Sequence, residues 1–140
     1  EVGTTKDVEL EGGKTRRYIA VDGGMSDNIR PGLYGAKYFA LLANRTSTSA
    51  GINSRLVGKH WETGDIIIRE IDLPSDVAPG DILAIPATGA YGRSMASNYN
   101  HMLKPAVISV ADGSARTILR RESEADLLAL DVVEAPRTIK

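Results

Sequence analysis

Cysteine is absent from the 140-residue chain, which excludes disulfide bonds, thiolate metal sites and any cysteine nucleophile or acid within it. An excess of charge is also missing. The formal net charge is −1, so the composition gives no reason to expect binding to nucleic acid or to an anionic membrane. The longest apolar runs, such as residues 39–43, are far shorter than the ~20 residues of a membrane-spanning helix. No signal peptide is visible, and a cytoplasmic protein is the simplest interpretation.

Several catalytic signatures are missing as well. The only histidines, His60 and His101, are far apart in the sequence and lack the carboxylate pattern of a zinc site, so we expect no metal. The glycine patterns that hold nucleotide phosphates are absent. No Gly-x-Ser-x-Gly segment is present for a serine nucleophile, although a Ser-His-Asp triad stays open. The chain begins with Glu1 rather than Met, and we expect it to be part of a longer protein.

Glycine, by contrast, is abundant and evenly spread, with 14 residues that separate many short apolar runs. This pattern is typical of a β-rich domain, and the length fits one domain with a substantial core. We expect seven or eight short strands and therefore a mainly β fold, either a barrel or a sandwich. The clearest expected strands cover residues 2–10, 16–21, 38–43, 55–59, 82–85, 106–110 and 115–120, with hairpin turns expected at residues 11–14 and, from the alternation around it, at Asp112-Gly113.

Short helices are expected at residues 29–34, 92–100 and 122–130. In the last of them, Ser123 is the expected N-cap and Asp126 occupies the third helical position, which together predict a capping box. The polar end of the chain, residues 134–140, is expected to be frayed. We therefore assign one domain to residues 1–133.

Glu62 and Asp65 lie in a loop bounded by glycines after an expected strand. Two carboxylates there can bind a substrate ammonium. The alternatives are a solvated Glu62 and an Asp65 that caps a helix, although the β-branched run at 66–68 favours a strand over 64–71 instead. Trp61, next to Glu62, is open to interpretation as a core residue, as a lone tryptophan usually is.

Arg30 and Tyr34 lie four residues apart, so on a helical turn both face the same side. An arginine beside a phenol can clamp a carboxylate with two parallel hydrogen bonds; the alternative is a surface arginine with a half-buried tyrosine. Tyr91 lies among small residues at 88–92, where a ligand can approach the backbone and a phenol can bind phosphate. The alternative is a tyrosine that marks the end of a strand.

Four short blocks carry a resemblance when they are taken together. They read Asp27-Asn28-Ile29-Arg30-Pro31-Gly32-Leu33-Tyr34, Gly58-Lys59-His60-Trp61-Glu62-Thr63-Gly64-Asp65, Thr88-Gly89-Ala90-Tyr91-Gly92 and Ser97-Asn98-Tyr99-Asn100. In order and spacing, the chain resembles the C-terminal β-domain of diaminopimelate decarboxylases, which are pyridoxal-phosphate enzymes of the alanine racemase-like fold group. It is most similar to actinobacterial versions, and the resemblance covers nearly the whole chain.

The resemblance implies a Greek-key-like β-barrel with short helices, which is the second domain of an enzyme whose first domain is a (β/α)8 barrel. That first domain would carry the Schiff-base lysine and most contacts to the cofactor, pyridoxal 5′-phosphate. Two subunits of a homodimer would build each active site. The reaction would remove the carboxylate at the D-centre of meso-2,6-diaminopimelate to give L-lysine, with the cofactor as electron sink. The isolated domain is expected to be inactive.

The family motif also implies roles for individual residues. Arg30 and Tyr34 would bind the distal carboxylate of the substrate, and Glu62 would bind its distal ammonium from the partner subunit. Tyr91 would contact both cofactor and substrate. Trp61 departs from the family, because it occupies the position of a cysteine that protonates the carbanion, and indole offers no acid near neutral pH.

Three explanations of Trp61 stay open: an engineered change that blocks turnover, a paralogous decarboxylase with an altered substrate, or slow protonation by a nearby acid or water. A function of another class is a stand-alone β-domain that acts as a binding or scaffold module. The sequence upstream of Glu1 separates the two classes. A barrel with a cofactor lysine would support the enzyme, and a Met directly before Glu1 would support the module.

Overall fold

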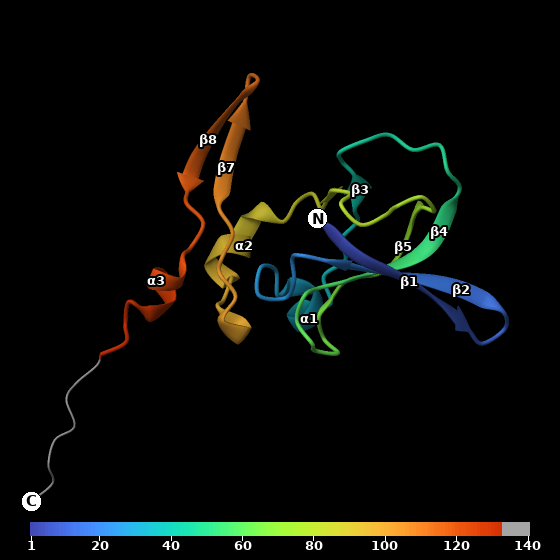
Figure 1. Cartoon of the computed structure of the whole chain (residues 1–140), viewed down its shortest axis with the longest axis horizontal. Coiled ribbons are helices and arrows are strands. Elements are labelled where there is room, and N and C mark those ends of the chain that lie inside the picture. Colours follow the sequence, from blue (N-terminus) through green and yellow to red (C-terminus); the bar gives the residue numbers. More distant parts are fainter. Residues whose placement is uncertain (133–140) are drawn as a thin grey trace, which may run out of the picture. The chain divides into compact units, whose positions relative to one another are not determined.

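The computed structural model describes residues 1–132, and these form two compact units (Figure 1), the first over residues 1–97 and the second from Asn98 onward. Most of the regular structure consists of strands joined by short helices. The predicted mainly β fold is therefore confirmed. The expected frayed tail at 134–140 lies outside the described residues.

A four-stranded sheet forms the centre of the first unit, with the strand order β1-β2-β4-β5. Strands β1 and β2 form the predicted antiparallel hairpin, whose turn places Gly12 and Gly13 at φ of 81° and 73°, where only glycine is unstrained. Strand β4 runs parallel to β2, and β5 runs antiparallel to β4. The strands span Val2–Leu10 (β1), Lys14–Val21 (β2), Gly51–Val57 (β4) and Ile66–Pro74 (β5).

Buried side chains of three neighbouring strands form a row across this sheet, since residues that pair lie on the same face. Ile19 of β2 pairs with Leu56 of β4, and Leu56 pairs with Ile68 of β5. All three side chains are buried. The β-branched run at 66–68 thus forms a strand, and the alternative in which Asp65 caps a helix is wrong. The remaining buried apolar residues are Val2, Ala40, Ile67, Leu73 and Val77.

The connections of the first unit carry two helices and a minimal two-stranded sheet. Helices α1 (Arg30–Tyr34) and α2 (Gly89–Met95) contain residues of two of the four sequence blocks. Strands β3 (Leu41–Leu42) and β6 (Leu83–Ala84) pair over only two residues each, so the longer strands predicted at 38–43 and 82–85 are wrong in extent.

An ion-pair network explains how such a short pairing is held in place. Arg45, just after β3, donates from Nε and Nη2 to both carboxylate oxygens of Asp81, just before β6, at 2.8 and 2.7 Å. These bonds, together with one from the backbone N–H of Ala78, hold the pKa of Asp81 well below its usual range. A bidentate arginine–carboxylate pair fixes orientation as well as distance, so the two flanking loops are tied together.

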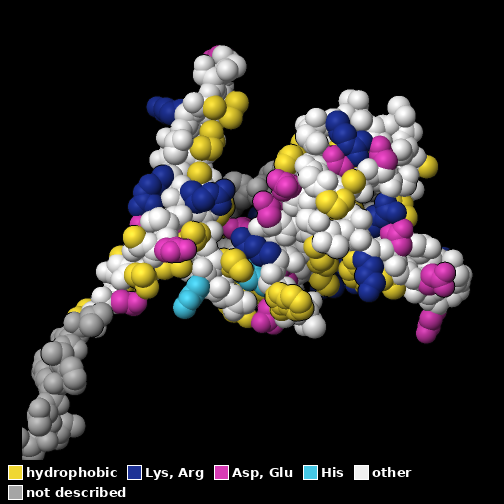
Figure 2. Space-filling view, viewed as in Figure 1, with side chains coloured by type: hydrophobic (Ala, Val, Ile, Leu, Met, Phe, Trp, Pro, Cys, Tyr) yellow, Lys and Arg dark blue, Asp and Glu magenta, His cyan; other side chains and the backbone are white. Residues whose placement is uncertain are grey.

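The second unit contains the hairpin predicted from the alternation around Asp112-Gly113. Strands β7 (Val107–Ala111) and β8 (Ser114–Leu119) are antiparallel, and Asp112 and Gly113 both adopt positive φ in the turn. A 3-10 helix, η1 (Tyr99–His101), precedes them. Apolar side chains remain on the surface of the hairpin (Figure 2), including Ile108, Val110 and Ile118.

Helix α3 (Glu124–Leu128) carries the predicted capping box. The backbone N–H of Ser123 donates to Asp126 Oδ2 at 2.7 Å, and the Ser123 side chain caps the backbone N–H of Asp126 in return. The helix is shorter than the predicted 122–130, and Leu130 is 91% exposed. No residue of the helix is fully buried: Leu127 is half-buried, and Leu128 is 61% exposed.

The described strands form three separate sheets, and none of the three is closed. The Greek-key-like barrel therefore stays a prediction beyond the confirmed mainly β class. No described helix combines the length and apolar character needed to cross a bilayer.

Candidate functional site

The carboxylate of Asp65 joins the second of the four sequence blocks to the segment just before the first. Asp65 is only 3% exposed, and its Oδ1 accepts a hydrogen bond from the backbone N–H of Met25 at 2.7 Å. Its Oδ2 accepts from the backbone N–H of His60, also at 2.7 Å. A buried carboxylate is stable only when its oxygens are hydrogen-bonded in this way. Asp65 thus ties the loop over 58–65 to the segment that leads into α1.

Two glycines leave the space that this carboxylate occupies. A Cβ added to Gly58 would lie 2.2 Å from Asp65 Oδ2, and one added to Gly24 would lie 2.8 Å from the Cδ2 atom of His60. Both distances are shorter than any real carbon contact. By contrast, a Cβ at Gly64, in the same loop, would meet nothing within 4 Å. Gly24 and Gly58 are therefore required by packing, whereas Gly64 is not.

His60 adds a second tie between the same segments. Its ring is 6% exposed, and Nε2 lies 2.8 Å from the hydroxyl oxygen of Ser26. The Nζ atom of Lys59 lies 3.6 Å from Asp27 Oδ2. The backbone N–H of Ser97, after α2, donates to the carbonyl of Ser26. The segment at 24–28 is therefore the common anchor of three blocks.

This structural core of the site supports an exposed rim. Trp61, which directly follows the buried His60, is 99% exposed, so the interpretation of Trp61 as a core residue is wrong. Glu62 is exposed beside it. Together with Tyr18 and Lys59, both residues line a shallow hollow of about 590 Å³ on the surface of the first unit. The loop thus presents one large aromatic side chain and one carboxylate to whatever binds there.

Helix α1 places its arginine next to this loop. Asn28 accepts the backbone N–H of Arg30, the first residue of the helix, through Oδ1 at 3.2 Å, and Gly35 ends the helix at φ 64°. Arg30 is partly buried, whereas Tyr34 is 66% exposed. A Cβ at Gly32 would lie 3.7 Å from the carbonyl oxygen of Gly64. The helix that carries the arginine and the loop that carries Glu62 are therefore close neighbours.

The phenol that contacts the guanidinium is one that the sequence analysis missed. Arg30 Nη1 donates to the hydroxyl oxygen of Tyr38 at 3.1 Å. Tyr38 follows the end of α1, so no helical spacing could have indicated this pair. Its ring packs against the hydrophobic core.

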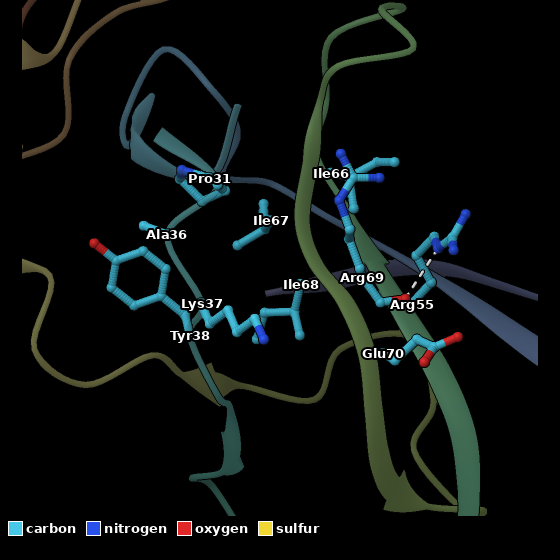
Figure 3. Close-up of a pocket in the computed structure, with 11 residues that line it drawn as sticks. Pro31, Ala36, Lys37, Tyr38, Arg55, Ile66, Ile67, Ile68, Arg69 and Glu70 are labelled. Carbon is cyan, nitrogen blue, oxygen red and sulfur yellow. Dashed lines mark hydrogen bonds between the residues drawn. The ribbon is translucent and has the colours of Figure 1, made fainter. Parts of the chain in front are cut away.

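A second hollow, of about 550 Å³, is lined in part by Tyr38 (Figure 3). Its lining comes from α1, the segment that follows α1, β4 and β5. Ile67 extends from β5 toward Pro31 and Ala36 (Figure 3). Arg55 lies on the opposite side, where its Nε donates to the carbonyl oxygen of Arg69 at 3.0 Å. The Tyr38 hydroxyl points away from β5.

Tyr91 lies on α2, apart from the Asp65 network. Its side chain is 72% exposed, and its backbone has φ of 64°, which is uncommon for a residue other than glycine and marks a constrained turn. Neighbouring Gly89 and Gly92 face open space. The structure thus places the Arg30 helix close to the Trp61–Glu62 loop and presents Tyr91 on a separate element of the same unit.

Comparison with known proteins agrees with the four sequence blocks. Residues 1–89 match the family described as pyridoxal-dependent decarboxylase, C-terminal sheet domain. Over 132 residues, or 94% of its length, the chain is 54% identical to the diaminopimelate decarboxylase of Mycobacterium bovis. Its identity to the diaminopimelate decarboxylase of Corynebacterium efficiens is also 54%, over 94% of the chain. The predicted resemblance to actinobacterial decarboxylases is confirmed.

Solved structures show the same relationship. The diaminopimelate decarboxylase of M. jannaschii in co-complex with L-lysine aligns over 95% of this chain and 29% of its own, with 30% identity and a TM-score of 0.81. The chain spans about 30% of the length of the M. bovis relative. What it shares with these proteins is therefore one part of a longer polypeptide.

Proposed function

Because this chain belongs to the family of pyridoxal-dependent decarboxylases, whose C-terminal sheet domain it matches, we propose that it is the C-terminal domain of a diaminopimelate decarboxylase. The 54% identity over 94% of the chain supports this substrate class. In this proposal, residues 1–133 are one domain that completes a Greek-key-like barrel. A (β/α)8 barrel domain precedes it, and the enzyme is a cytoplasmic homodimer.

The observation that carries the proposal is that the helix of Arg30 and the loop of Glu62 are close neighbours on one domain, so that at a two-fold interface Arg30 of each subunit can share a substrate with Glu62 of the partner subunit. The distal end of meso-2,6-diaminopimelate is a zwitterion, which needs a cationic fork for its carboxylate and an anion for its ammonium. Arg30 supplies the fork, with a phenol from Tyr34, and Glu62 supplies the anion. Decarboxylation at the D-centre leaves this distal end unchanged, so the product L-lysine is held by the same groups.

The exposed state of the loop supports action across a subunit interface. Trp61 is 99% exposed and Glu62 is exposed, although a large aromatic side chain normally gains by burial. We assign the loop to the interface of the homodimer, where Glu62 binds the ammonium of a substrate held by the partner subunit. The loop's rigid attachment through Asp65 then sets the depth to which Glu62 reaches.

Pyridoxal phosphate, when bound, supplies the electron sink for the pair of electrons left by the departing carboxylate. The residues of this chain fit a peripheral role toward it. Tyr91 presents a phenol that is 72% exposed, between glycines whose surroundings are open, so a flat group can approach it. We assign Tyr91 to cofactor and substrate contact, and the Schiff-base lysine and most phosphate contacts to the barrel domain.

Trp61 is the residue that separates this chain from its relatives in chemistry. The family position requires a proton donor, and an indole N–H is not an acid near neutral pH. Glu62 or a water that it holds is the nearest replacement for the donor. Trp61 also favours a second candidate function, a paralogous decarboxylase whose substrate differs at its distal end.

The assignment of Arg30 predicts a specific loss of affinity. In the full-length protein, Arg30→Ala removes a charge-assisted contact worth roughly 1.5–3 kcal/mol, so the affinity for meso-diaminopimelate and L-lysine should fall about ten- to a hundredfold. D-lysine keeps the reacting centre but has no distal carboxylate, and its affinity should stay unchanged. Calorimetric binding of the three ligands measures this. Equal losses for D-lysine and L-lysine would show that Arg30 does not bind the distal carboxylate.

A further inference from the structure

A tyrosine outside the recognised blocks holds the arginine that this proposal assigns to the substrate. Arg30 Nη1 donates to Tyr38 Oη at 3.1 Å. Tyr38 is half-buried, and its ring packs against the hydrophobic core of the first unit. The hydroxyl points away from β5 (Figure 3). Because its ring is held by the core, Tyr38 fixes a hydrogen-bond acceptor next to the guanidinium of Arg30.

We infer that Tyr38 is a positioning residue, which holds the Arg30 guanidinium in the orientation that receives the distal carboxylate of the substrate. This inference rests on the proposed function, since it requires that Arg30 bind a carboxylate. Tyr38 itself contacts no substrate. It acts by restricting the side chain that does.

The geometry leaves the guanidinium free for its second task. Arginine has five N–H donors in a planar fork, and the bond to Tyr38 uses one of them, on Nη1. The remaining N–H groups are enough for a bidentate contact with a carboxylate. A phenol oxygen is neutral, so it orients the guanidinium without cancelling its charge, as a carboxylate in the same place would.

The conformational entropy that an arginine side chain loses on binding explains why the hydrogen bond from Arg30 to Tyr38 would matter. An arginine side chain has several rotatable bonds, and a free guanidinium must lose that freedom when it binds a ligand. Preorganisation removes this loss from the binding step and so raises affinity. Tyr34, the phenol in the family motif, is 66% exposed, and its ring lacks the core support of Tyr38. The two tyrosines thus divide the work: Tyr34 meets the ligand, and Tyr38 holds the arginine.

The test measures L-lysine binding by calorimetry in the full-length protein that carries Trp61→Cys. Tyr38→Phe, which deletes a single oxygen, should weaken L-lysine binding about tenfold, the effect of losing one hydrogen bond to a charged group. It should leave D-lysine, which lacks the distal carboxylate, unaffected. In an Arg30→Ala background, Tyr38→Phe should have no further effect, because the group through which it acts is gone.

The outcomes separate this inference from the proposal on which it rests. If Arg30→Ala weakens L-lysine binding but Tyr38→Phe does not, the positioning role of Tyr38 is wrong and the proposed function stands. An equal loss for D-lysine, or the same loss in the Arg30→Ala background, assigns Tyr38 a general structural role and also overturns the inference. If Arg30→Ala leaves L-lysine binding unchanged, the proposed carboxylate site itself is wrong.

Discussion

Trp61→Cys should raise lysine formation by the full-length protein about 10²–10⁴-fold, which is the usual contribution of a placed general acid. The substitution restores a titratable thiol at the family's proton-donor position and removes an indole that a substrate must otherwise displace. The exposure of Trp61, at 99%, means that the domain loses no packing when the indole is removed. Lysine release from meso-diaminopimelate, measured at saturating substrate, gives the rate.

Trp61→Ser is the matched control for this prediction. Serine creates the same space as cysteine but offers no comparable acid, so it separates the steric effect from proton donation. We expect serine to improve substrate affinity without the gain in turnover. If cysteine and tryptophan support equal rates, the family role does not apply at this position, and Glu62 or a water that it holds becomes the better candidate for the acid.

Gly58→Ala should destabilise the domain and disrupt the Glu62 loop. The added Cβ would lie 2.2 Å from a carboxylate oxygen of Asp65 and 2.3 Å from the other, and Asp65 is too buried to move aside. Overpacking of this kind costs roughly 1–3 kcal/mol, and each displaced hydrogen bond to the carboxylate adds about 1.5–3 kcal/mol. Urea unfolding of the full-length protein, followed by fluorescence, measures the loss.

Gly64→Ala provides the control within the same loop. Its Cβ would face open space, so the free energy of unfolding should be nearly unchanged. If both alanine variants are equally stable, Asp65 is not packed against Gly58 as described, and its role as the tie between the two blocks is wrong.

Patterns that depend on neighbouring residues were predicted well from the sequence. The turn glycines of the β1–β2 hairpin, the Asp112-Gly113 turn and the Ser123 capping box were all found. Each depends on interactions within a few residues, where spacing determines geometry. The β-branched run at 66–68 likewise predicted a strand correctly, because β-branched side chains pack well on a partly buried sheet.

Features that depend on distant residues were missed. Asp65 was expected to bind a ligand or to cap a helix, but it accepts a backbone N–H from Met25, forty positions earlier in the chain. Tyr38 bonds Arg30 across the end of a helix, where no periodicity applies. Nothing in the sequence assigned a packing role to Gly24 and Gly58, although their lack of a Cβ is what admits the carboxylate. The only local signal for this packing was that each glycine lies two residues before a polar residue, Ser26 or His60, and both of these are buried.

Substrate choice by the full-length protein with Trp61→Cys tests the central claim most directly. The protein is supplied with pyridoxal phosphate and equal amounts of meso-diaminopimelate, ornithine and arginine, and the products are quantified by mass spectrometry. A domain that binds a distal zwitterion through Arg30 and Glu62 predicts lysine as the dominant product, with little putrescine or agmatine. Dominant formation of putrescine or agmatine would contradict the account, because their substrates, ornithine and arginine, have no distal carboxylate for Arg30 to bind.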